Sequence, residues 1–225
     1  MAARAWPIVL LLALALLSPA RAAIVAFQDD TLADADWEMT IFYSEGNSGT
    51  TTAWQVATGG NPGAFRMVET IVNDAPPYSG IGAFHRYLPA VYDPGTSGAI
   101  LSIDYSEDSS MFAGGGAGQA TGPALRQAGV VYYHHLNGTS FGGWRSYSIA
   151  GLTAVDFRDS PYGNQHPDFS ATAPPIEVGF YRANSTYSGG YTILAGIDNW
   201  RFTIRNDQPT AARSSTWGRI RGLNR

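Results

Sequence analysis

Residues 191–204 read YTILAGIDNWRFTI, and the alternation in the second half of this stretch decides the fold class. Trp200, Phe202 and Ile204 share one parity, while arginine and threonine occupy the other. Side chains of a strand point to opposite faces with a period of two, so the apolar parity faces a core. Counting back two residues from Trp200 places Asp198 on that same inward face. The stretch therefore predicts a half-buried strand that directs a carboxylate at the core.

Short segments rich in β-branched and aromatic residues continue this pattern through residues 23–205, between loops of Gly, Pro, Asn, Asp and Ser. The clearest predicted strands are 38–44, 51–58, 65–72, 98–106, 128–136, 143–150 and 175–183. Predicted long loops occupy 75–82, 109–122 and 159–175. Asn-Gly at 137–138 predicts a hairpin turn, and Ser-Gly-Gly at 188–190 predicts a second. The pattern is typical of an all-β sandwich or barrel.

The first 22 residues have the features of a secretory signal peptide. An apolar run at 8–17 follows a positive charge and precedes a cleavage pattern of small residues that ends at Ala22. The run is shorter than the roughly 20 residues that a membrane-spanning helix needs, although an uncleaved anchor is the alternative. We expect cleavage after Ala22, a β-sandwich domain at 23–205, and a linker with a basic tail at 206–225. No transmembrane segment is expected after cleavage, so the protein is predicted to be secreted, extracellular or in the cell envelope.

Charge and composition exclude two classes of function. The 225 residues carry 14 Lys and Arg against 18 Asp and Glu, which gives a net charge of −4. Loss of the predicted signal peptide removes two arginines and no acid, so the net charge becomes −6. An acidic chain without a basic stripe lacks the electrostatic feature that nucleic acid requires. The absence of cysteine excludes thiolate chemistry and is more typical of a bacterial than an animal secreted protein.

Four segments of the chain resemble a bacterial secreted jelly-roll β-sandwich. They are AFQDDTLADADW (26–37), SYSIAGLTAVDF (146–157), HPDFSATAPPIEVGF (166–180) and GIDNWRFTI (196–204). Together they are similar to carbohydrate-binding modules of the galactose-binding-like type, with laminin-B-like domains as more distant relatives. The resemblance implies an antiparallel jelly roll in which the first and last strands lie side by side. It also implies a structural calcium ion between these strands.

Three aspartates are the predicted ligands of that Ca²⁺ ion. Asp29 and Asp30 leave the first strand, and Asp198 lies in the last strand. Calcium takes six to eight oxygen ligands, and three carboxylates at one point would repel one another without a cation or protons. Alternatively, Asp198 caps a turn through backbone amides or pairs with an arginine. The sequence leaves both interpretations open.

The stretch GAILSIDYSEDS (98–109) comes closest to a catalytic motif. One large family of jelly-roll glycosidases carries Glu-x-Asp-x-x-Glu on a strand, and retaining hydrolysis needs two carboxylates about 5–5.5 Å apart. Here Ser102 occupies the first Glu position, ahead of Asp104 and Glu107. A hydroxyl cannot replace the carboxylate nucleophile of that mechanism, so the sequence predicts a protein without catalytic activity.

Aromatic residues are the remaining signal and make up 12% of the chain. Sugar-binding proteins stack exposed aromatic faces on the apolar side of a pyranose and add polar hydrogen bonds. The predicted ligand-binding residues are Trp54, Tyr133, Trp144 and Tyr162, although strand tryptophans are more often core residues. Further aromatic residues in or beside loops are Tyr78, Phe112, Tyr187 and Tyr191.

We expect an exported sandwich that binds carbohydrate or a cell-surface polymer. The alternatives are a structural or adhesive surface protein attached through its C-terminal tail, and a divergent glycoside hydrolase.

Overall fold

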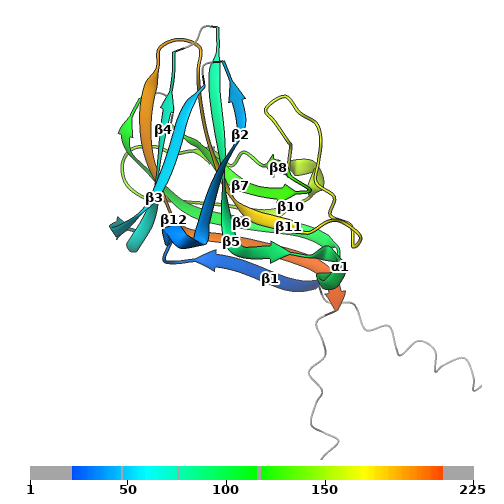
Figure 1. The fold of residues 1–225 in the computed structure, drawn as a ribbon. Helices are drawn as coiled ribbons and strands as arrows, with labels where there is room; N and C mark the ends of the chain where they lie inside the picture. Colours follow the sequence, from blue (N-terminus) through cyan, green and yellow to red (C-terminus); the bar gives the residue numbers. More distant parts are fainter. Residues whose placement is uncertain (1–21, 47, 75–76, 116–117, 210–225) are drawn as a thin grey trace, which may run out of the picture.

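The computed structural model describes residues 22–46, 48–74, 77–115 and 118–209. Most of them belong to two antiparallel β-sheets that face one another (Figure 1). The predicted all-β sandwich is therefore confirmed. The predicted signal peptide lies outside the described residues except for Ala22, and so does the predicted tail from residue 210 onward.

One sheet is built around the long C-terminal strand and is called the β12 sheet. Its order is β10 (Arg145–Leu152), β6 (Ile100–Gly114), β12 (Tyr191–Pro209), β4 (Gly63–Val72) and β3 (Gly49–Gly60), and β1 (Ala22–Asp29) also pairs with β12. The other is called the β11 sheet. Its order is β2 (Trp37–Glu45), β5 (Ser79–Tyr92), β11 (Ile176–Thr186), β7 (Ala120–Gln127) and β8 (Val130–Tyr133), and β9 (Asn137–Gly138) also pairs with β7. Three short helices complete the fold: η2 (Asp34–Asp36), α1 (Pro94–Ser97) and η3 (Ala154–Asp156).

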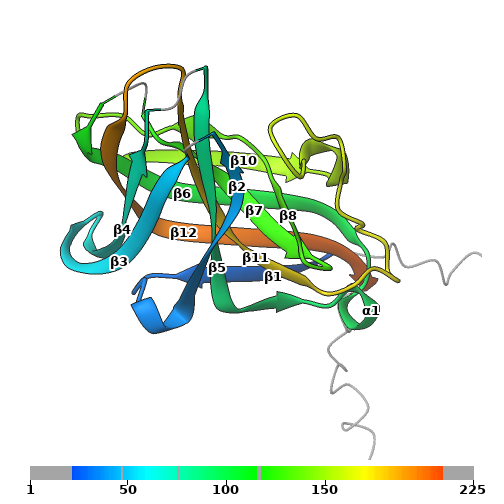
Figure 2. The same cartoon turned by 45° about the horizontal axis from the view of Figure 1, so that its top comes forward.

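The first and last strands lie side by side, as the resemblance implies. β12 is so long that its first half pairs with β4 and its second half with β1, while β6 follows its other edge. β10, β6, β12 and β1 accordingly run next to one another in one layer (Figure 2). Ala22 pairs with Pro209, so the described chain begins and ends at the same end of the sandwich. β12 also continues beyond the predicted domain limit at residue 205.

The main hydrophobic core fills the space between the two sheets. Trp200, Phe202 and Ile204 are fully buried in it, which confirms the apolar parity read from the sequence. The ring of Trp37 lies 5.1 Å from Trp200 and 5.2 Å from Phe180, so residues of both sheets meet in one aromatic cluster. Such tilted and edge-to-face ring pairs add to the stability gained from burial.

A buried ion pair also connects the two sheets. Arg182 of β11 donates to the Glu107 carboxylate of β6 over 3.0 Å, and neither side chain is exposed. Tyr105 and Thr121 donate further hydrogen bonds of 2.5 and 2.7 Å to the same carboxylate. Burying a charge is costly unless it is paired and hydrogen-bonded, and this network meets both conditions. Glu107 is therefore a structural residue of the interior.

β12 contains a bulge directly after Asp198. Asp198 lies opposite Asp108 of β6, but Arg201 lies opposite Ser106, so β12 has one residue more than its partner across this interval. Asn199 adopts the left-handed conformation, with φ of 49°. Asparagine tolerates this conformation better than most residues, and an inserted residue bends the strand locally.

The bulge reverses the side-chain alternation of the strand. Before the bulge, odd-numbered residues such as Ala195 and Ile197 point into the core. After the bulge, even-numbered residues such as Trp200 do so. Asp198 therefore lies on the outer face of the β12 sheet, and the prediction that it faces the core is wrong. Its side chain is nevertheless only 1% exposed, because the β3–β4 turn at Asn61 contacts it from outside.

The turns differ from the predicted ones. The residues at 137–138 form β9 and pair with β7, so they are not the turn of a hairpin. The hairpin between β7 and β8 turns instead at Ala128 and Gly129, with φ of 50° and 84°. The segment at 188–190 connects β11 to β12, which belong to different sheets, so it is a connection between the layers.

Two of the predicted loops contain strand residues. β5 begins at Ser79, inside the predicted loop 75–82, while β6 extends to Gly114 and β7 begins at Ala120. The sequence of these segments is rich in Gly, Ala and Ser, which have low strand propensity. They form strands because neighbouring strands of the same sheet supply hydrogen-bond partners for their backbone. The loop at 159–175 contains no strand, as predicted.

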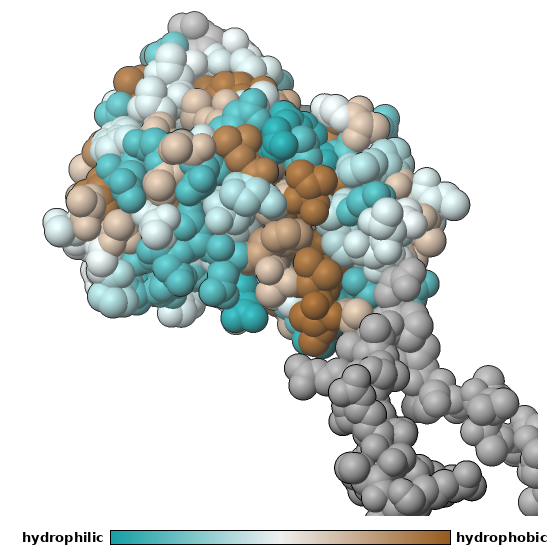
Figure 3. Space-filling model, turned by 60° about the horizontal axis from the view of Figure 1, so that its bottom comes forward, coloured by the Kyte–Doolittle hydropathy of each residue, from teal (hydrophilic) through white to brown (hydrophobic). Residues whose placement is uncertain are grey.

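The lower face of the molecule is largely hydrophilic or neutral, and its hydrophobic residues form a narrow band (Figure 3). Single exposed apolar residues occur on the strands; Ile24 of β1 is 58% exposed. Exposed apolar residues of this kind are ordinary in folded domains and do not by themselves mark a binding face. Among the described residues there is no helix of the length and hydropathy that a membrane crossing requires.

Candidate functional site

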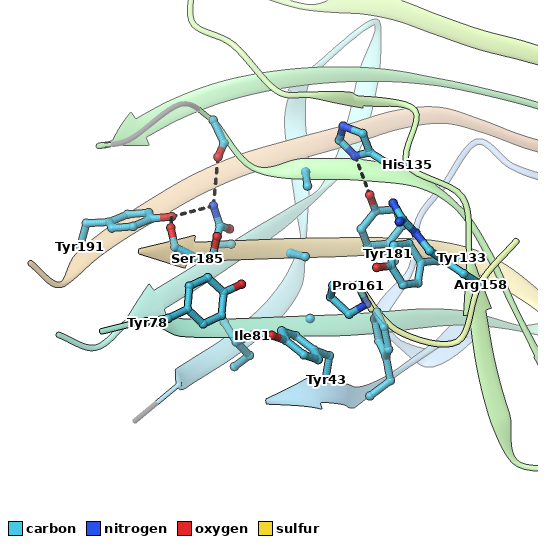
Figure 4. Close-up of a pocket in the computed structure, with 16 residues that line it drawn as sticks. Tyr43, Tyr78, Ile81, Tyr133, His135, Arg158, Pro161, Tyr181, Ser185 and Tyr191 are labelled. Atoms are coloured by element: carbon cyan, nitrogen blue, oxygen red, sulfur yellow. Dashed lines mark hydrogen bonds between the residues drawn. The ribbon is translucent and has the colours of Figure 1, made fainter. Parts of the chain in front are cut away.

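A groove of about 340 Å³ lies on the outer face of the β11 sheet (Figure 4). Its volume is in the range typical of small-ligand sites. Five tyrosines line it: Tyr43, Tyr78, Tyr133, Tyr181 and Tyr191. Tyr43, Tyr133, Tyr181 and Tyr191 come from β2, β8, β11 and β12, and Tyr78 directly precedes β5, so residues distant in sequence meet only when the sandwich is folded.

The floor of the groove is a second hydrophobic cluster, separate from the main core. Tyr181 lies 4.6 Å from Tyr133, and Phe42 lies 5.4 Å from Tyr133, measured between ring centres. Ala120 and Ala183 pack against the same cluster. Because the side chains of these alanines are small, they leave space between the aromatic rings, and this space is the hollow of the groove.

Two glycines of β5 provide the space for the aromatic rings. A Cβ atom placed on Gly80 would lie 2.7 Å from the Tyr78 hydroxyl, and one on Gly82 would lie 3.0 Å from the Phe42 ring. Both distances are shorter than ordinary contacts, so side chains here would displace the rings. The glycines that weaken the strand signal in the sequence are thus part of the shape of the groove.

One end of the groove carries a fixed set of hydrogen bonds. The Asn184 side-chain amide donates to the Tyr191 hydroxyl over 3.2 Å and to the Gly118 carbonyl over 3.0 Å. Tyr191 in turn donates to the Ser185 carbonyl over 3.0 Å. Burial raises the pKa of Tyr191, so its hydroxyl remains protonated at neutral pH.

The opposite end combines an imidazole and a guanidinium group (Figure 4). His135 Nδ1 lies 2.8 Å from the Tyr181 hydroxyl, within hydrogen-bond distance. The Arg158 guanidinium lies 5.6 Å from the centre of the Tyr133 ring, a cation–π distance. Burial, with the positive charge of Arg158, lowers the pKa of His135, so this imidazole is neutral at pH 7.

Of the four predicted ligand-binding residues, the structure places one in the groove and one beside it. Tyr133 forms part of the floor and is 6% exposed. Tyr162 is 78% exposed and follows Pro161, which lines the groove. Tyr162 itself does not line it. Trp54 and Trp144 lie elsewhere, on the outer face of the β12 sheet.

Trp144 packs against the β12 sheet. Its indole nitrogen donates to the Gly59 carbonyl over 2.9 Å, and its ring lies 5.2 Å from Phe65 and 5.7 Å from Phe112. A Cβ atom on Gly196 would lie 2.8 Å from this indole, so the absence of a side chain there lets the ring approach the strand. These contacts describe a packed and partly exposed tryptophan.

Trp54 is placed on the same outer face by the alternation of β3. The preceding residue, Ala53, packs against the main core, so the next side chain points the other way. Trp54 pairs with Met67 of β4 and is partly exposed. The structure does not bring Trp54 and Tyr133 together, and ligand binding at the two tryptophans stays a prediction.

Two of the predicted calcium ligands, Asp29 and Asp198, are engaged in separate hydrogen-bond networks. Asp29 accepts bonds of 2.8 Å from the Trp37 indole and from Thr31. Burial alone would raise the pKa of Asp29, but these hydrogen bonds outweigh it and hold the pKa below its usual value. Asp30, the next residue, is exposed.

Asp198 accepts hydrogen bonds from two backbone amides, those of Asn61 and Asn199. These are the contacts expected if it caps a turn. Burial raises the pKa of its carboxyl, and the charge of Asp108 adds to this. Within the part of the chain that the structure describes, no three Asp, Glu or His side chains are grouped so that they could hold a metal ion. The predicted ligands do not form one donor set, and calcium stays a prediction.

The two acids of the glycosidase-like stretch lie on opposite faces of β6. Glu107 points between the sheets to Arg182, whereas Asp104 lies outside and pairs with Arg205 over 2.7 Å. Two carboxylates of a retaining glycosidase must face the same substrate. This arrangement does not fit that mechanism.

Sequence reasoning missed several groove residues, above all Tyr43, Tyr181 and Arg158. The sequence identifies Tyr78 and Tyr191 only as members of a general set of aromatic residues in or beside loops. Strand pairing brings the tyrosines of different strands together. Tyr181 of β11 lies opposite Phe84 of β5, and β5 also pairs with β2, which carries Tyr43. Such a register cannot be read from one sequence.

No protein-family model matches the chain, and no curated protein matches it. Among solved structures, it is similar to a family 11 carbohydrate-binding module from Clostridium thermocellum in complex with a β-1,3-1,4-mixed-linked tetrasaccharide. That match has a TM-score of 0.45 and 13% identity, and covers 85% of this chain and 99% of the module. The C-terminal family 22 module of Clostridium thermocellum Xyn10B matches with a TM-score of 0.40 and 12% identity over 79% of this chain and 92% of the module. The xylan-binding CBM22-1 domain of Paenibacillus barcinonensis Xyn10C gives a TM-score of 0.38 and 10% identity over 83% of this chain and 97% of the domain.

Proposed function

We propose that the protein binds carbohydrate in the groove on the outer face of the β11 sheet. The observation that carries the proposal is the group of five tyrosines around one hollow of about 340 Å³. Aromatic rings offer flat apolar faces for the C–H face of a pyranose, and their hydroxyl groups can exchange hydrogen bonds with sugar hydroxyls. A groove that combines many rings with a few fixed polar groups suits such an amphipathic ligand.

The polar groups are held in place before any ligand arrives. Asn184, Tyr191 and the Ser185 carbonyl are connected by hydrogen bonds at one end, and His135 and Tyr181 at the other. Groups that are already ordered lose little conformational freedom on binding, which favours affinity. The tyrosine rings are carried largely by paired strands, so they too lose little conformational freedom when a ligand binds.

We propose binding without hydrolysis. None of the Asp and Glu residues in the described ranges lines the groove, whereas most glycoside hydrolases place two carboxylates at the scissile bond. Export and attachment through the C-terminal tail remain predictions that concern residues outside the described part. A spacer or adhesive protein without a defined ligand is the competing account.

A glycan array with the purified domain tests this proposal. We expect saturable binding to at least one class of plant or microbial polysaccharide, and free oligosaccharide of the same class should compete for it. An array without saturable signal for any carbohydrate would refute the proposed function and support the spacer. Incubation of bound oligosaccharides with the protein, followed by mass analysis, should show intact ligands.

A further inference from the structure

The groove has an unusual charge for this protein. The whole chain has 18 acidic and 14 basic residues, so its net charge is negative. Arg158 is nevertheless the one charged side chain among the described residues that line the groove. An acidic protein that keeps its carboxylates out of a site and places a guanidinium there presents a local positive potential.

Arg158 differs from the other arginines on the same face of the β11 sheet. Arg86 and Arg126 both pair with Glu177, over 2.8 and 2.5 Å, and both also reach Glu38. Their charges are therefore neutralised within the sheet. Arg158 has no carboxylate within ion-pair distance among the described residues.

The acids near Arg158 in the sequence are engaged elsewhere. Asp156 accepts hydrogen bonds from Thr153 at the start of η3. Asp159 accepts a hydrogen bond of 3.2 Å from the Gln165 amide. Glu45, which binds the Tyr43 hydroxyl, does not line the groove.

The position of Arg158 is fixed by the backbone. Its amide and carbonyl groups form a two-bond bridge with Tyr133, with lengths of 3.0 and 3.1 Å. Its guanidinium group lies over the ring of the same tyrosine. An arginine anchored in this way needs little reordering to receive a ligand.

We infer that the groove binds an acidic carbohydrate, in which a uronate carboxylate or a sulfate ester pairs with Arg158 while the tyrosines contact the sugar rings. This inference rests on the proposed function and adds the chemical class of the ligand. A guanidinium group can donate two parallel hydrogen bonds to a carboxylate or sulfate, and such charge-assisted bonds are stronger than neutral ones. Since His135 is neutral at pH 7, it adds a polar contact and no competing charge.

The test uses pairs of ligands with the same backbone and different charge. Galacturonan oligosaccharides are compared with their methyl esters, glucuronoxylan oligosaccharides with unsubstituted xylan, and sulfated galactans with desulfated ones. The wild type, Arg158→Gln and Arg201→Gln are titrated with each. Arg201 lies on the outer face of the β12 sheet, and its replacement removes the same charge far from the groove.

We expect the wild type to bind the charged member of at least one pair about tenfold or more tightly, a preference that rising salt reduces. Arg158→Gln should lose this preference and bind both members alike, while Arg201→Gln should keep it. A preference within a uronate pair identifies a carboxylate as the partner of Arg158, and a preference within the galactan pair identifies a sulfate ester. Equal or tighter wild-type binding of the neutral members, or a preference that survives Arg158→Gln, would overturn the inference and leave carbohydrate binding intact. Absence of binding to every member would also overturn the inference, and the proposed function would still be judged by the array of all carbohydrates.

Discussion

Asn199 shows how one residue changes the surroundings of its neighbours. Its left-handed φ of 49° lets β12 insert one residue, and its side chain donates to Asp108 over 2.6 Å and to the Asn61 carbonyl over 2.5 Å. Because of this insertion, Asp198 leaves the core face and meets the β3–β4 turn. A carboxylate that would be costly inside an apolar core is thus placed among backbone amides, which stabilise its charge.

Whether calcium also binds at Asp198 is decided by a chelator experiment. A ligand that binds only the folded state stabilises it by about 2.7 kcal/mol at a hundredfold excess over its dissociation constant. Calcium binding therefore predicts that a chelator lowers the melting temperature of the wild type and leaves that of Asp198→Ala almost unchanged. A wild-type melting curve that does not respond to the chelator would favour the hydrogen-bonded alternative.

His85 is the residue that should make stability depend on pH near neutrality. It is fully buried, and its ring stacks on Phe180 at 4.4 Å. Burial, together with the charges of Arg66 and Arg182, lowers its pKa far below the usual value near 6.5. As the pH falls below about 6.5, the unfolded chain takes up a proton here that the folded protein does not, so stability decreases by up to about 1.4 kcal/mol per pH unit.

His85→Phe preserves the stacked ring and removes the titrating group. The free energy of unfolding of each protein is measured in urea at pH 7 and at pH 5. We expect it to decrease less over this interval in His85→Phe than in the wild type. Identical slopes for both proteins over this interval would show that His85 does not carry the effect.

At the scale of elements, the hairpin between β7 and β8 offers the clearest prediction. Both of its turn residues, Ala128 and Gly129, have positive φ, as a type I′ turn requires. An L-residue such as alanine pays about 1–2 kcal/mol for the left-handed conformation, whereas asparagine is favoured at this position. Ala128→Asn should therefore increase the free energy of unfolding by roughly 0.5–1 kcal/mol. A decrease in urea midpoint would contradict the turn assignment.

The same elements show how far the sequence can be read. The parity of Trp200, Phe202 and Ile204 predicted β12 correctly, because packing against one core imposes a period of two. The Asn-Gly pair at 137–138 was misleading, because β7 supplies hydrogen-bond partners that local turn preference does not include. Register and bulges depend on contacts between distant segments, so the outward position of Asp198 could not be predicted.

At the scale of the whole molecule, the two sheets are held together by a polar pair as well as by the core. Removing one partner of the Glu107–Arg182 pair leaves the other charge buried and alone, which typically costs 3–5 kcal/mol. We expect Arg182→Met to be this destabilising and the double variant with Glu107→Leu to recover much of the loss. A double-mutant cycle by chemical denaturation measures this; strictly additive losses would contradict the coupling.

The two groups of candidate aromatic residues lie on opposite outer faces of the sandwich. The tyrosine groove lies outside the β11 sheet, and Trp54 and Trp144 lie outside the β12 sheet, so the sandwich itself keeps them apart. The sequence pointed to aromatic residues in general and included Tyr133 of the groove. It could not select the face, since that choice depends on which strands become neighbours.

The central claim is tested most directly by calorimetric titration of three proteins with an oligosaccharide selected on the array. Tyr78 lines the groove and is partly exposed, whereas Trp54 is a partly exposed aromatic residue of the other face. Thermal melting first establishes that each variant is folded. We predict that Tyr78→Ala binds at least about tenfold more weakly than the wild type, a loss of roughly 1.4 kcal/mol, and that Trp54→Ala binds equally well. Unchanged affinity in Tyr78→Ala together with lost affinity in Trp54→Ala would contradict the account and place the site on the β12 sheet.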